Sequence, residues 1–125
     1  MAGRIIHPGN CKGPILYTEV PLLIYGGIDV STGIILEEGH PLQGECIQDK
    51  ILVFPRAKGS TVGSYTLLQV KANHQAPMAI INEHCEPIIA TGVIMARIPC
   101  IDEIDIKRLK HANQLEIKEG NIMYC

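Results

Sequence analysis

The 125-residue sequence lacks several signals that mark large classes of proteins. It has no block of like charges and a formal net charge of -2, so no extended basic surface is predicted for a nucleic-acid backbone. Its longest apolar stretches, residues 21–28 and 88–96, are about half of the ~20 residues that a membrane-spanning helix needs. The first residues lack the apolar core of a signal peptide. We therefore expect a cytoplasmic protein that binds neither nucleic acid nor membranes.

Closely spaced metal ligands are also missing. The cysteines are odd in number and form no CxxC pair: Cys11, Cys46, Cys85, Cys100 and Cys125. The five histidines show no HxxxH or HExxH spacing. We predict reduced, mostly packing thiols, surface or turn histidines, and no metal bound by this chain alone. His40, in the loop sequence GHPLQG, is the least ordinary of the histidines.

Aromatic residues make up only 4% of the chain, so its core must be built from aliphatic side chains. The hydrophobic share of 46% and the charged share of 19% are ordinary for a folded protein. A chain of this length is expected to form one domain over residues 1–125 and to bury about two-thirds of its unfolded surface.

Short apolar runs separated by turn signals predict many strands and few helices. Strands are expected at 4–7, 14–19, 50–54, 77–81 and 97–101, an apolar segment at 22–25, and a hairpin of 115–117 with 122–124. Residues 88–96 fit either a short buried helix or a strand. A helix is predicted over 64–73, against a sheet, with these apolar residues at helical spacing: Tyr65, Leu67, Leu68, Val70 and Ala72. Strands with one or two helices predict a single α/β or α+β domain.

The stretch KGSTVGSY, residues 58–65, gathers glycines, hydroxyl residues and a lysine between a predicted strand and a predicted helix. If the helix begins near Gly63, the preceding residues present N–H and hydroxyl groups at its positive end, where an anion is stabilised. Lys58 and Arg56 add positive charge nearby. The structural alternative is that Ser60 or Ser64 caps the helix while the glycines relieve turn strain. The spelling excludes a Walker A loop and a nucleophile elbow.

Four motifs follow one another along the chain: GGIDVSTG at 26–33, GHPLQG at 39–44, KILVFP at 50–55 and KGSTVGSYTLL at 58–68. Two more stretches continue the series: APMAIIN at 76–82 and PIIATGVIMARIP at 87–99. In order and spacing these motifs resemble the small subunit of the aconitase X family. The resemblance implies an α/β fold, a single swivelling β/β/α domain similar to the fourth, C-terminal domain of aconitase, which closes over a larger partner.

The resemblance also implies a hydro-lyase activity. The expected reaction is loss of water from (R)-5-phosphomevalonate to give trans-anhydromevalonate 5-phosphate, in a modified mevalonate pathway for isoprenoid biosynthesis. In this family the large catalytic subunit holds an iron-sulfur cluster, expected to be of the 4Fe-4S type. Its iron acts as a Lewis acid on the departing hydroxyl, while a base from the small subunit removes the proton next to the carboxylate.

This chain is accordingly expected to act on a small phosphorylated hydroxy acid only as part of a heterodimer or higher heteromer. Two alternatives stay open. One is the small subunit of another aconitase X dehydratase, such as a hydroxyproline dehydratase. The other is a non-catalytic module that binds phosphate through the turn at 59–64.

The resemblance assigns the base to Ser60, because aconitase-type swivel domains place a catalytic serine directly after a glycine at this turn. A serine alkoxide is useful only where N–H dipoles and cations stabilise it. Aconitase has an arginine two positions after the serine, whereas this chain has Val62, so either Lys58 or a cation of the partner must substitute. Substrate contacts are expected from six residues: Asp29, Lys58, Gly59, Thr61, Gly63 and Ser64. Asp29 fits an Asx-turn cap equally well.

Overall fold

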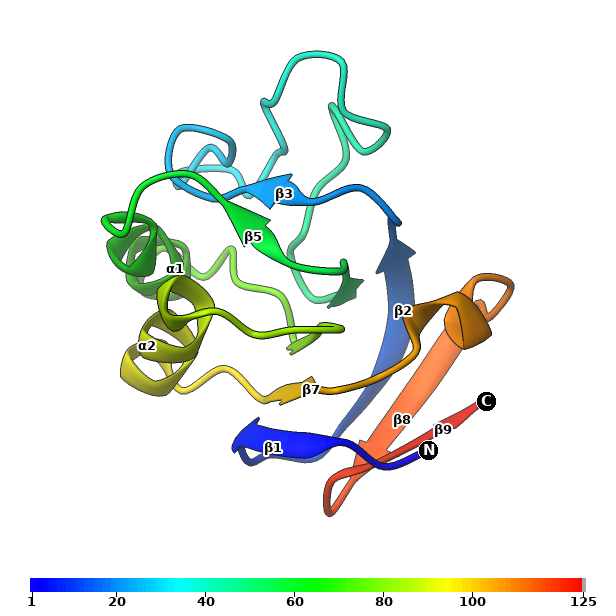
Figure 1. The fold of residues 1–125 in the computed structure, drawn as a ribbon. Coiled ribbons are helices and arrows are strands. Elements are labelled where there is room, and N and C mark those ends of the chain that lie inside the picture. Colours follow the sequence, from blue (N-terminus) through cyan, green and yellow to red (C-terminus); the bar gives the residue numbers. More distant parts are fainter. Residues whose placement is uncertain (125) are drawn as a thin grey trace.

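The computed structural model describes residues 1–124 (Figure 1). In chain order its elements are β1 (Arg4–His7), β2 (Cys11–Tyr17), β3 (Leu22–Leu23), β4 (Ile51–Val53), β5 (Ala57–Lys58), α1 (Gly63–Ala72), β6 (Ala79–Ile81), α2 (Pro87–Ala96), β7 (Cys100–Asp102), the 3-10 helix η1 (Ile106–Leu109), β8 (Gln114–Lys118) and β9 (Asn121–Tyr124). Cys125, whose thiol was predicted to be reduced, lies outside the described residues.

Seven strands form the main sheet, in the spatial order β1-β7-β6-β4-β2-β8-β9. Strands β2, β4, β6 and β7 run parallel to their neighbours in this series, whereas β1 and the hairpin β8–β9 join the two ends antiparallel. A second, two-stranded sheet pairs β3 with β5 in parallel. The mixture of parallel strands and helices confirms the predicted α/β class.

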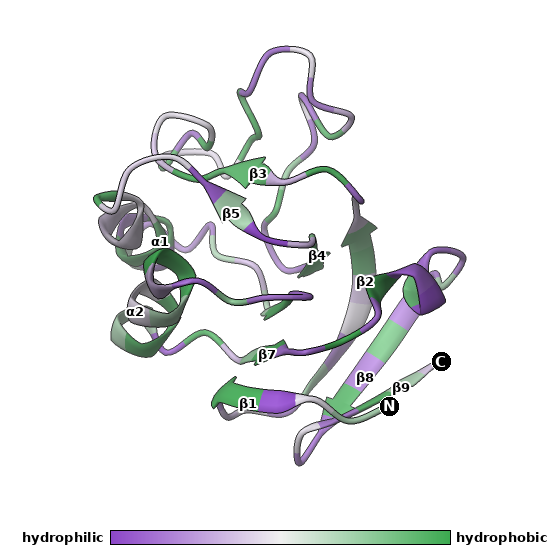
Figure 2. Ribbon diagram, in the orientation of Figure 1, coloured by the Kyte–Doolittle hydropathy of each residue, from purple (hydrophilic) through white to green (hydrophobic). Residues whose placement is uncertain are grey.

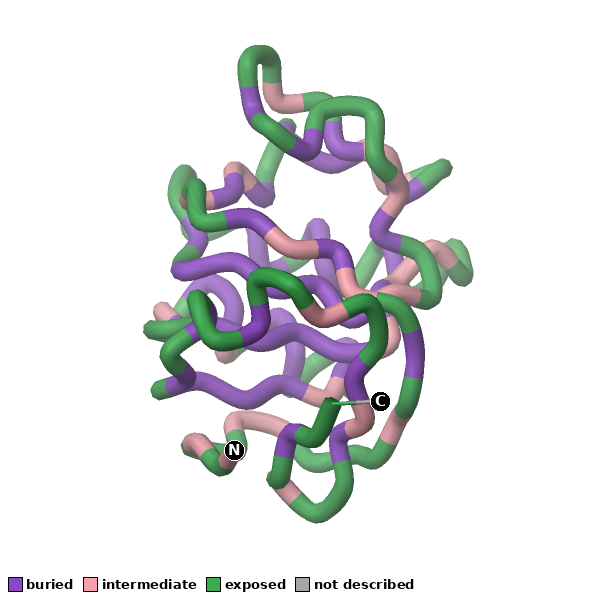
Figure 3. The backbone as a smooth tube through the Cα atoms, turned by 90° about the vertical axis from the view of Figure 1, so that its right-hand side faces the viewer, coloured by how far each residue is buried: buried purple, intermediate pink, exposed green. Residues whose placement is uncertain are grey.

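Every residue of the central strands β4 and β6 is buried, so these strands are covered on both faces. Figure 3 shows buried segments, in purple, running through the middle of the molecule. Leu52 and Phe54 point into a core shared with α1 and α2, while Ile51 and Val53 point into a second core. Successive side chains of a strand point to opposite faces, so a strand covered on both sides must be a continuous apolar run. This is why ILVF at 51–54 could be recognised as a strand from the sequence.

The helices α1 and α2 cover one face of the sheet (Figure 1). On the other face, the end of the sheet formed by the β8–β9 hairpin curls over, and together with η1 it packs on the central strands. Strand β8 is a half-buried strand, because Leu115 and Ile117 are buried while Gln114 and Lys118 are exposed. Its alternating bands of hydropathy are visible in Figure 2. An antiparallel strand at the margin of a sheet can keep one face in water, which explains the alternation.

Helix α1 begins one residue earlier than predicted and buries a different face. Leu67 and Val70 are buried as expected, but Tyr65, Leu68 and Ala72 are exposed, so that part of the prediction was wrong. The inward stripe contains Gly63 and polar side chains instead, since α1 packs against α2 as well as the sheet. Apolar spacing alone did not reveal this stripe because its members include glycine, serine and threonine.

The remaining elements refine the sequence-based assignments. Residues 87–96 form the helix α2, with Pro87 at its first turn and Arg97 in a left-handed conformation at its end. The strand predicted at 97–101 therefore begins only at Cys100. The strand expected at 14–19 runs from Cys11 to Tyr17, while β5 and η1 were not predicted. Both α-helices have ten residues, and the described part of the chain contains no helix long and apolar enough to span a membrane.

A methyl group added at Gly92 tests how tightly α2 packs on α1. Its Cβ would lie 2.6 Å from Leu67 Cδ1 and 3.1 Å from Leu67 Cβ, and Leu67 is fully buried. Gly92→Ala is expected to lower the free energy of unfolding by about 1–2 kcal/mol, because overpacking outweighs the gain in helix propensity. Thr91→Ala, at an exposed position of the same helix, should change it by less than about 0.5 kcal/mol. Urea unfolding measures both, and a stabilised Gly92→Ala would contradict the packing.

Candidate active site

The turn between β5 and α1 depends on Gly59. Its φ angle is +106°, a conformation that side-chain-bearing residues rarely adopt. A Cβ atom there would also lie 2.6 Å from Leu23 Cδ1 of β3. Both the backbone conformation and the close contact require glycine at this position. Because Gly59 has no side chain, the turn can pass directly over Leu23 of the short β3–β5 sheet.

Ser60 stands exposed at the positive end of α1. Its Oγ accepts a hydrogen bond from the N–H of Val62 (3.3 Å), and its carbonyl accepts one from the N–H of Gly63 (3.0 Å). The hydroxyl oxygen thus already faces an N–H group of the first helical turn. Negative charge that develops on this oxygen is stabilised by that N–H and by the helix dipole.

Gly63 and Ser64 face inward, unlike the residues before them. A Cβ at Gly63 would lie 3.1 Å from Ile88 Cγ2 and 3.3 Å from Ile24 Cβ, so this glycine lets α1 pack closely. Ser64 is 7% exposed, and its hydroxyl donates to the carbonyls of Thr61 (3.2 Å) and Ile88 (3.0 Å). The helix cap is Val62, and no side chain caps it. The predicted capping role of Ser64 was therefore wrong, because its hydroxyl ties α1 to α2.

Lys58 is held by a residue that the sequence analysis missed. Its Nζ lies 2.6 Å from Oε2 of Glu37, whose Oε1 accepts the N–H of Leu23 at 2.9 Å. Burial of Glu37 opposes ionisation, but the hydrogen bonds from Lys58 and Leu23 outweigh it and hold the pKa of Glu37 below its usual value. Glu37 thus links the loop after β3 to both strands of the small sheet. No local spacing signals this contact, since only the pairing of β3 with β5 creates it.

Asp29 does not join the turn at Ser60. Its Oδ1 accepts the N–H of Ser31 at 2.9 Å, which is the Asx-turn arrangement. The carbonyl of the next residue, Val30, accepts a bond from Asn73 at the C-terminal end of α1, whereas Ser60 precedes the N-terminal end. A ten-residue helix is about 15 Å long, so the loop of Asp29 and the turn lie at opposite ends of α1.

His40 connects the loop at 39–44 to the residue that precedes β3. Its Nδ1 accepts the N–H of Leu42 at 3.0 Å, which leaves the proton on Nε2 to be donated to the carbonyl of Pro21 at 3.2 Å. The ring is 6% exposed. These two hydrogen bonds hold the loop at 39–44 against the start of β3.

Two hollows in the described surface lie away from the turn. One of about 290 Å³ lies between β1, β7 and the β8–β9 turn and includes His7 and Glu119. Another of about 240 Å³ includes Asp49 and Lys71. Neither contains any of residues 58–64, and Lys58, Gly59, Ser60 and Thr61 are all exposed. A site built on this turn needs a second surface to enclose it.

The described residues do not fit a metal ion or an iron-sulfur cluster. Among residues 1–124, no three His, Cys, Asp or Glu side chains lie close enough together to hold a metal. Two thiols meet, those of Cys85 and Cys100, but clusters are generally held by more ligands than two. The expectation that a partner subunit carries the cluster stays a prediction.

The fold and the turn together define the class of protein. One face of a mixed sheet is covered by helices, the other by a hairpin, and an exposed serine stands at the head of the helix after β5. This is a swivelling β/β/α domain, as predicted. The chain belongs to the aconitase X family: the family model for the aconitase X swivel domain matches residues 1–124.

Named relatives and a solved structure agree with this assignment. The chain is 45% identical over 117 residues to the phosphomevalonate dehydratase small subunit of Thermococcus sibiricus, covering 94% of this chain and 90% of that protein. It is 48% identical over 123 residues to the subunit of the same name from Methanosarcina acetivorans, covering 98% and 82%. It superposes on aconitase X of Thermococcus kodakaraensis, solved in its holo-form, with a TM-score of 0.96 at 40% identity, covering 99% and 96%.

The Lys58–Glu37 pair predicts how stability depends on pH. Since the folded-state pKa of Glu37 is lowered, its ionised form stabilises the fold above the ordinary value of 4.5, and this contribution is lost as pH falls through the folded value. Glu37→Gln is expected to cost about 1 kcal/mol at pH 7, because Lys58 is half-exposed, and much less at pH 3.

Thermal unfolding from pH 3 to pH 7 measures this difference. Glu38→Gln is the matched control, since Glu38 is exposed and makes no ion pair with the described residues. A cost for Glu37→Gln that stays constant across the whole range would contradict the role of the ionised carboxylate.

Proposed function

We propose that this chain is the small subunit of a phosphomevalonate dehydratase, a hydro-lyase that converts (R)-5-phosphomevalonate to trans-anhydromevalonate 5-phosphate. Relatives of that name, 45% and 48% identical over nearly the whole chain, support this function. They do not favour the two alternatives, a hydroxyproline dehydratase subunit and a non-catalytic phosphate-binding module. The cytoplasmic location and the absence of nucleic-acid binding stay predictions.

The proposal rests chiefly on one observation, the position of Ser60 Oγ. It is exposed, precedes α1, and accepts the N–H of Val62. In the proposed mechanism Ser60 acts as an alkoxide that takes the proton from the carbon next to the substrate carboxylate. The electron pair of that C–H bond forms the double bond as the hydroxyl leaves the neighbouring carbon. The N–H of Val62 and the dipole of α1 stabilise the charge on Oγ before the proton arrives.

The turn supplies binding groups on its exposed side. Lys58, Gly59 and Thr61 offer an ammonium group, a close-approaching backbone and a hydroxyl to an anionic substrate. Gly63 and Ser64 face the protein interior and support the turn indirectly. They hold the first turn of α1 against Ile24 and against Ile88 of α2. Because Glu37 engages Lys58, we assign Glu37 the role of positioning this ammonium. Lys58 is thus one candidate for the positive charge that aconitase takes from its arginine, and a cation of the partner is the alternative.

We place the large subunit over the turn. Four exposed apolar side chains lie within the turn, next to it along the chain, or beside residues that contact it: Tyr25, Leu36, Val62 and Tyr65. Tyr25 follows Ile24, which packs on Gly63, and Leu36 precedes Glu37, which binds Lys58. A covering surface would bury these side chains and exclude water from Ser60. In the proposed complex the large subunit also holds the iron-sulfur cluster, which supplies Lewis acidity for the departing hydroxyl.

Replacing each serine separately tests the assignment of the base. Ser60→Ala, in the complex with the large subunit, should lower kcat for phosphomevalonate dehydration by roughly a hundredfold to ten-thousandfold, the range for loss of a general base. Its melting temperature should change little, because the side chain is exposed. Ser64→Ala should retain substantial activity but cost about 1 kcal/mol of stability, since the hydroxyl's buried bond to Ile88 and its partly buried bond to Thr61 are lost. The reverse pattern, an inactive Ser64→Ala and an active Ser60→Ala, would refute the assignment.

A charge placed on the apolar surface tests the docking of the partner. Tyr25→Lys should weaken association with the large subunit by at least about tenfold, because the lysine would have to be desolvated at the interface. Tyr124→Lys is the matched control, since the two tyrosines are 57% and 58% exposed and Tyr124 lies in the β8–β9 hairpin. Binding of purified subunits is measured by biolayer interferometry. Equal affinities of the two variants would show that the large subunit docks elsewhere.

A further inference from the structure

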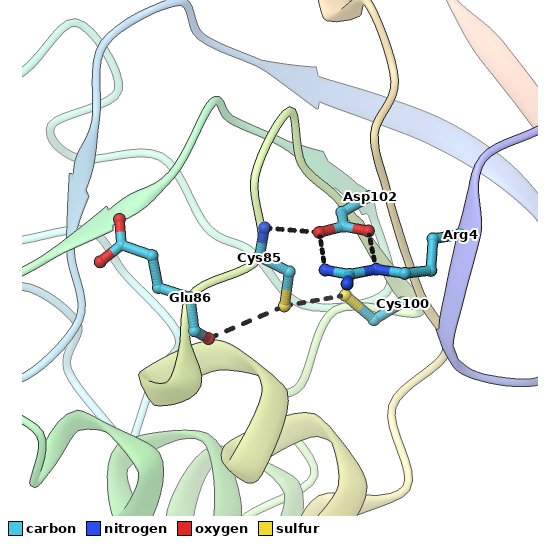
Figure 4. A network of polar contacts seen from close by, with 5 residues as sticks. All are labelled: Arg4, Cys85, Glu86, Cys100 and Asp102. Atoms are coloured by element: carbon cyan, nitrogen blue, oxygen red, sulfur yellow. Dashed lines mark hydrogen bonds and ion pairs between the residues drawn. The ribbon is translucent and has the colours of Figure 1, made fainter.

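Two cysteines far from each other in the sequence meet inside the molecule. Cys85 lies in the segment between β6 and α2, and Cys100 is the first residue of β7. Their Sγ atoms are 4.0 Å apart (Figure 4). A disulfide bond is about 2 Å long, so the sulfurs must approach by roughly 2 Å. Rotation of the Cys85 side chain can supply that movement, whereas the backbone of Cys100 is fixed in the sheet.

The surroundings of the two thiols differ. The contact with Cys100 outweighs the effect of burial and lowers the pKa of Cys85, whereas that same contact and burial raise the pKa of Cys100 well above its usual value. The nearby charges include Arg4, which favours a Cys85 thiolate, and Asp102 and Glu86, which oppose it. Cys85 is also the more exposed of the two, at 6% against none for Cys100, so it is the sulfur that an oxidant meets as the nucleophile.

An ion pair holds the segment of Cys85 against β7. Arg4 binds both carboxylate oxygens of Asp102, at 2.9 and 2.7 Å, and the N–H of Cys85 donates to Oδ2 of the same carboxylate at 2.8 Å (Figure 4). Asp102 is two residues after Cys100 on β7. The carboxylate therefore fixes the backbone of Cys85 while its side chain remains beside Cys100.

The other described thiols lack such a partner. Cys46 is half-buried and its Sγ contacts the carbonyl of Thr32 at 3.3 Å, and Cys11 is half-buried with a pKa raised by burial. Within residues 1–124, Cys85 and Cys100 are the pair of sulfurs in contact. Cys85 retains 6% exposure and Cys100 none, so a small oxidant reaches Cys85 first.

We propose that Cys85 and Cys100 are an oxidation site, which forms a reversible intrachain disulfide when the protein meets hydrogen peroxide. The Cys85 thiolate attacks one peroxide oxygen, the O–O bond breaks, and Cys85 becomes a sulfenic acid while the leaving hydroxide takes up a proton to form water. The sulfur of Cys100 then attacks the sulfenic sulfur, the S–O bond breaks, and the departing hydroxide takes the Cys100 proton to leave as a second water. The two sulfurs lose two electrons and the peroxide gains them. A small thiol restores both cysteines by disulfide exchange.

Peptide mapping of the full chain tests this proposal directly. The five cysteines lie on five different tryptic peptides, with Cys85 on 72–97 and Cys100 on 98–107. Reduced protein is treated with hydrogen peroxide below its melting temperature, alkylated, and digested without reduction. The expected main product joins these two peptides, the intact chain having lost about 2 Da, or two hydrogens. Dithiothreitol should reverse it. The same treatment in guanidinium should give a mixture of pairings, because the fold no longer selects one.

Two variants separate the roles of the cysteines. Cys100→Ser should leave Cys85 as a sulfenic acid that dimedone traps, and Cys85→Ser should slow oxidation of Cys100 at least about tenfold, because the pair has lost its nucleophile. Melting curves establish that each variant is folded. The peptide mapping of the wild-type chain tests the proposal even if a variant fails to fold. The proposal fails if folded wild-type protein yields a different main pairing, or no linked peptide at a peroxide dose that oxidises Cys11 or Cys46. It also fails if no cysteine reacts.

Discussion

Burial of the central strands on both faces is the constraint on which the rest of the structure depends. β4 and β6 carry apolar side chains to both sides, and each buried Ile, Leu or Phe contributes about 1.5–3 kcal/mol only if water is excluded there. The chain must therefore build two covers, one of helices and one of a hairpin with η1. α1 belongs to the first cover, so its N-terminus and the turn before it are held at the margin of a rigid core.

The turn at Ser60 is accordingly rigid on one side and open on the other. Below it, Gly59 passes over Leu23, Gly63 packs on Ile24, and Ser64 binds the backbone of α2. Above it, nothing in the described chain encloses Ser60. A preorganised serine in contact with bulk water is a poor base, because water competes for the N–H groups that would stabilise its charge. The exposure of Ser60 therefore favours, independently of the names of relatives, a site completed by a larger partner.

Charged groups in this fold serve mainly to join elements that packing alone would leave loose. Glu37 ties the loop after β3 to Leu23 and Lys58, and Asp102 ties β1 and the segment between β6 and α2 to β7. Both carboxylates are mostly or fully buried and accept backbone N–H groups as well as a cation. Removing the cation that binds such a carboxylate costs more stability than the ion pair contributes, since the carboxylate is left buried without its partner.

The sequence by itself determined the elements whose cause is local. Continuous apolar runs marked the buried strands, and the glycines and hydroxyl residues of KGSTVGSY marked the turn, because φ preferences and strand periodicity act within a few residues. Only the tertiary structure decided which face of α1 is buried, that Ser64 serves packing, and that Glu37 meets Lys58 and Cys85 meets Cys100. These contacts join distant segments through strand pairing and helix packing, whose register no single segment of the chain encodes.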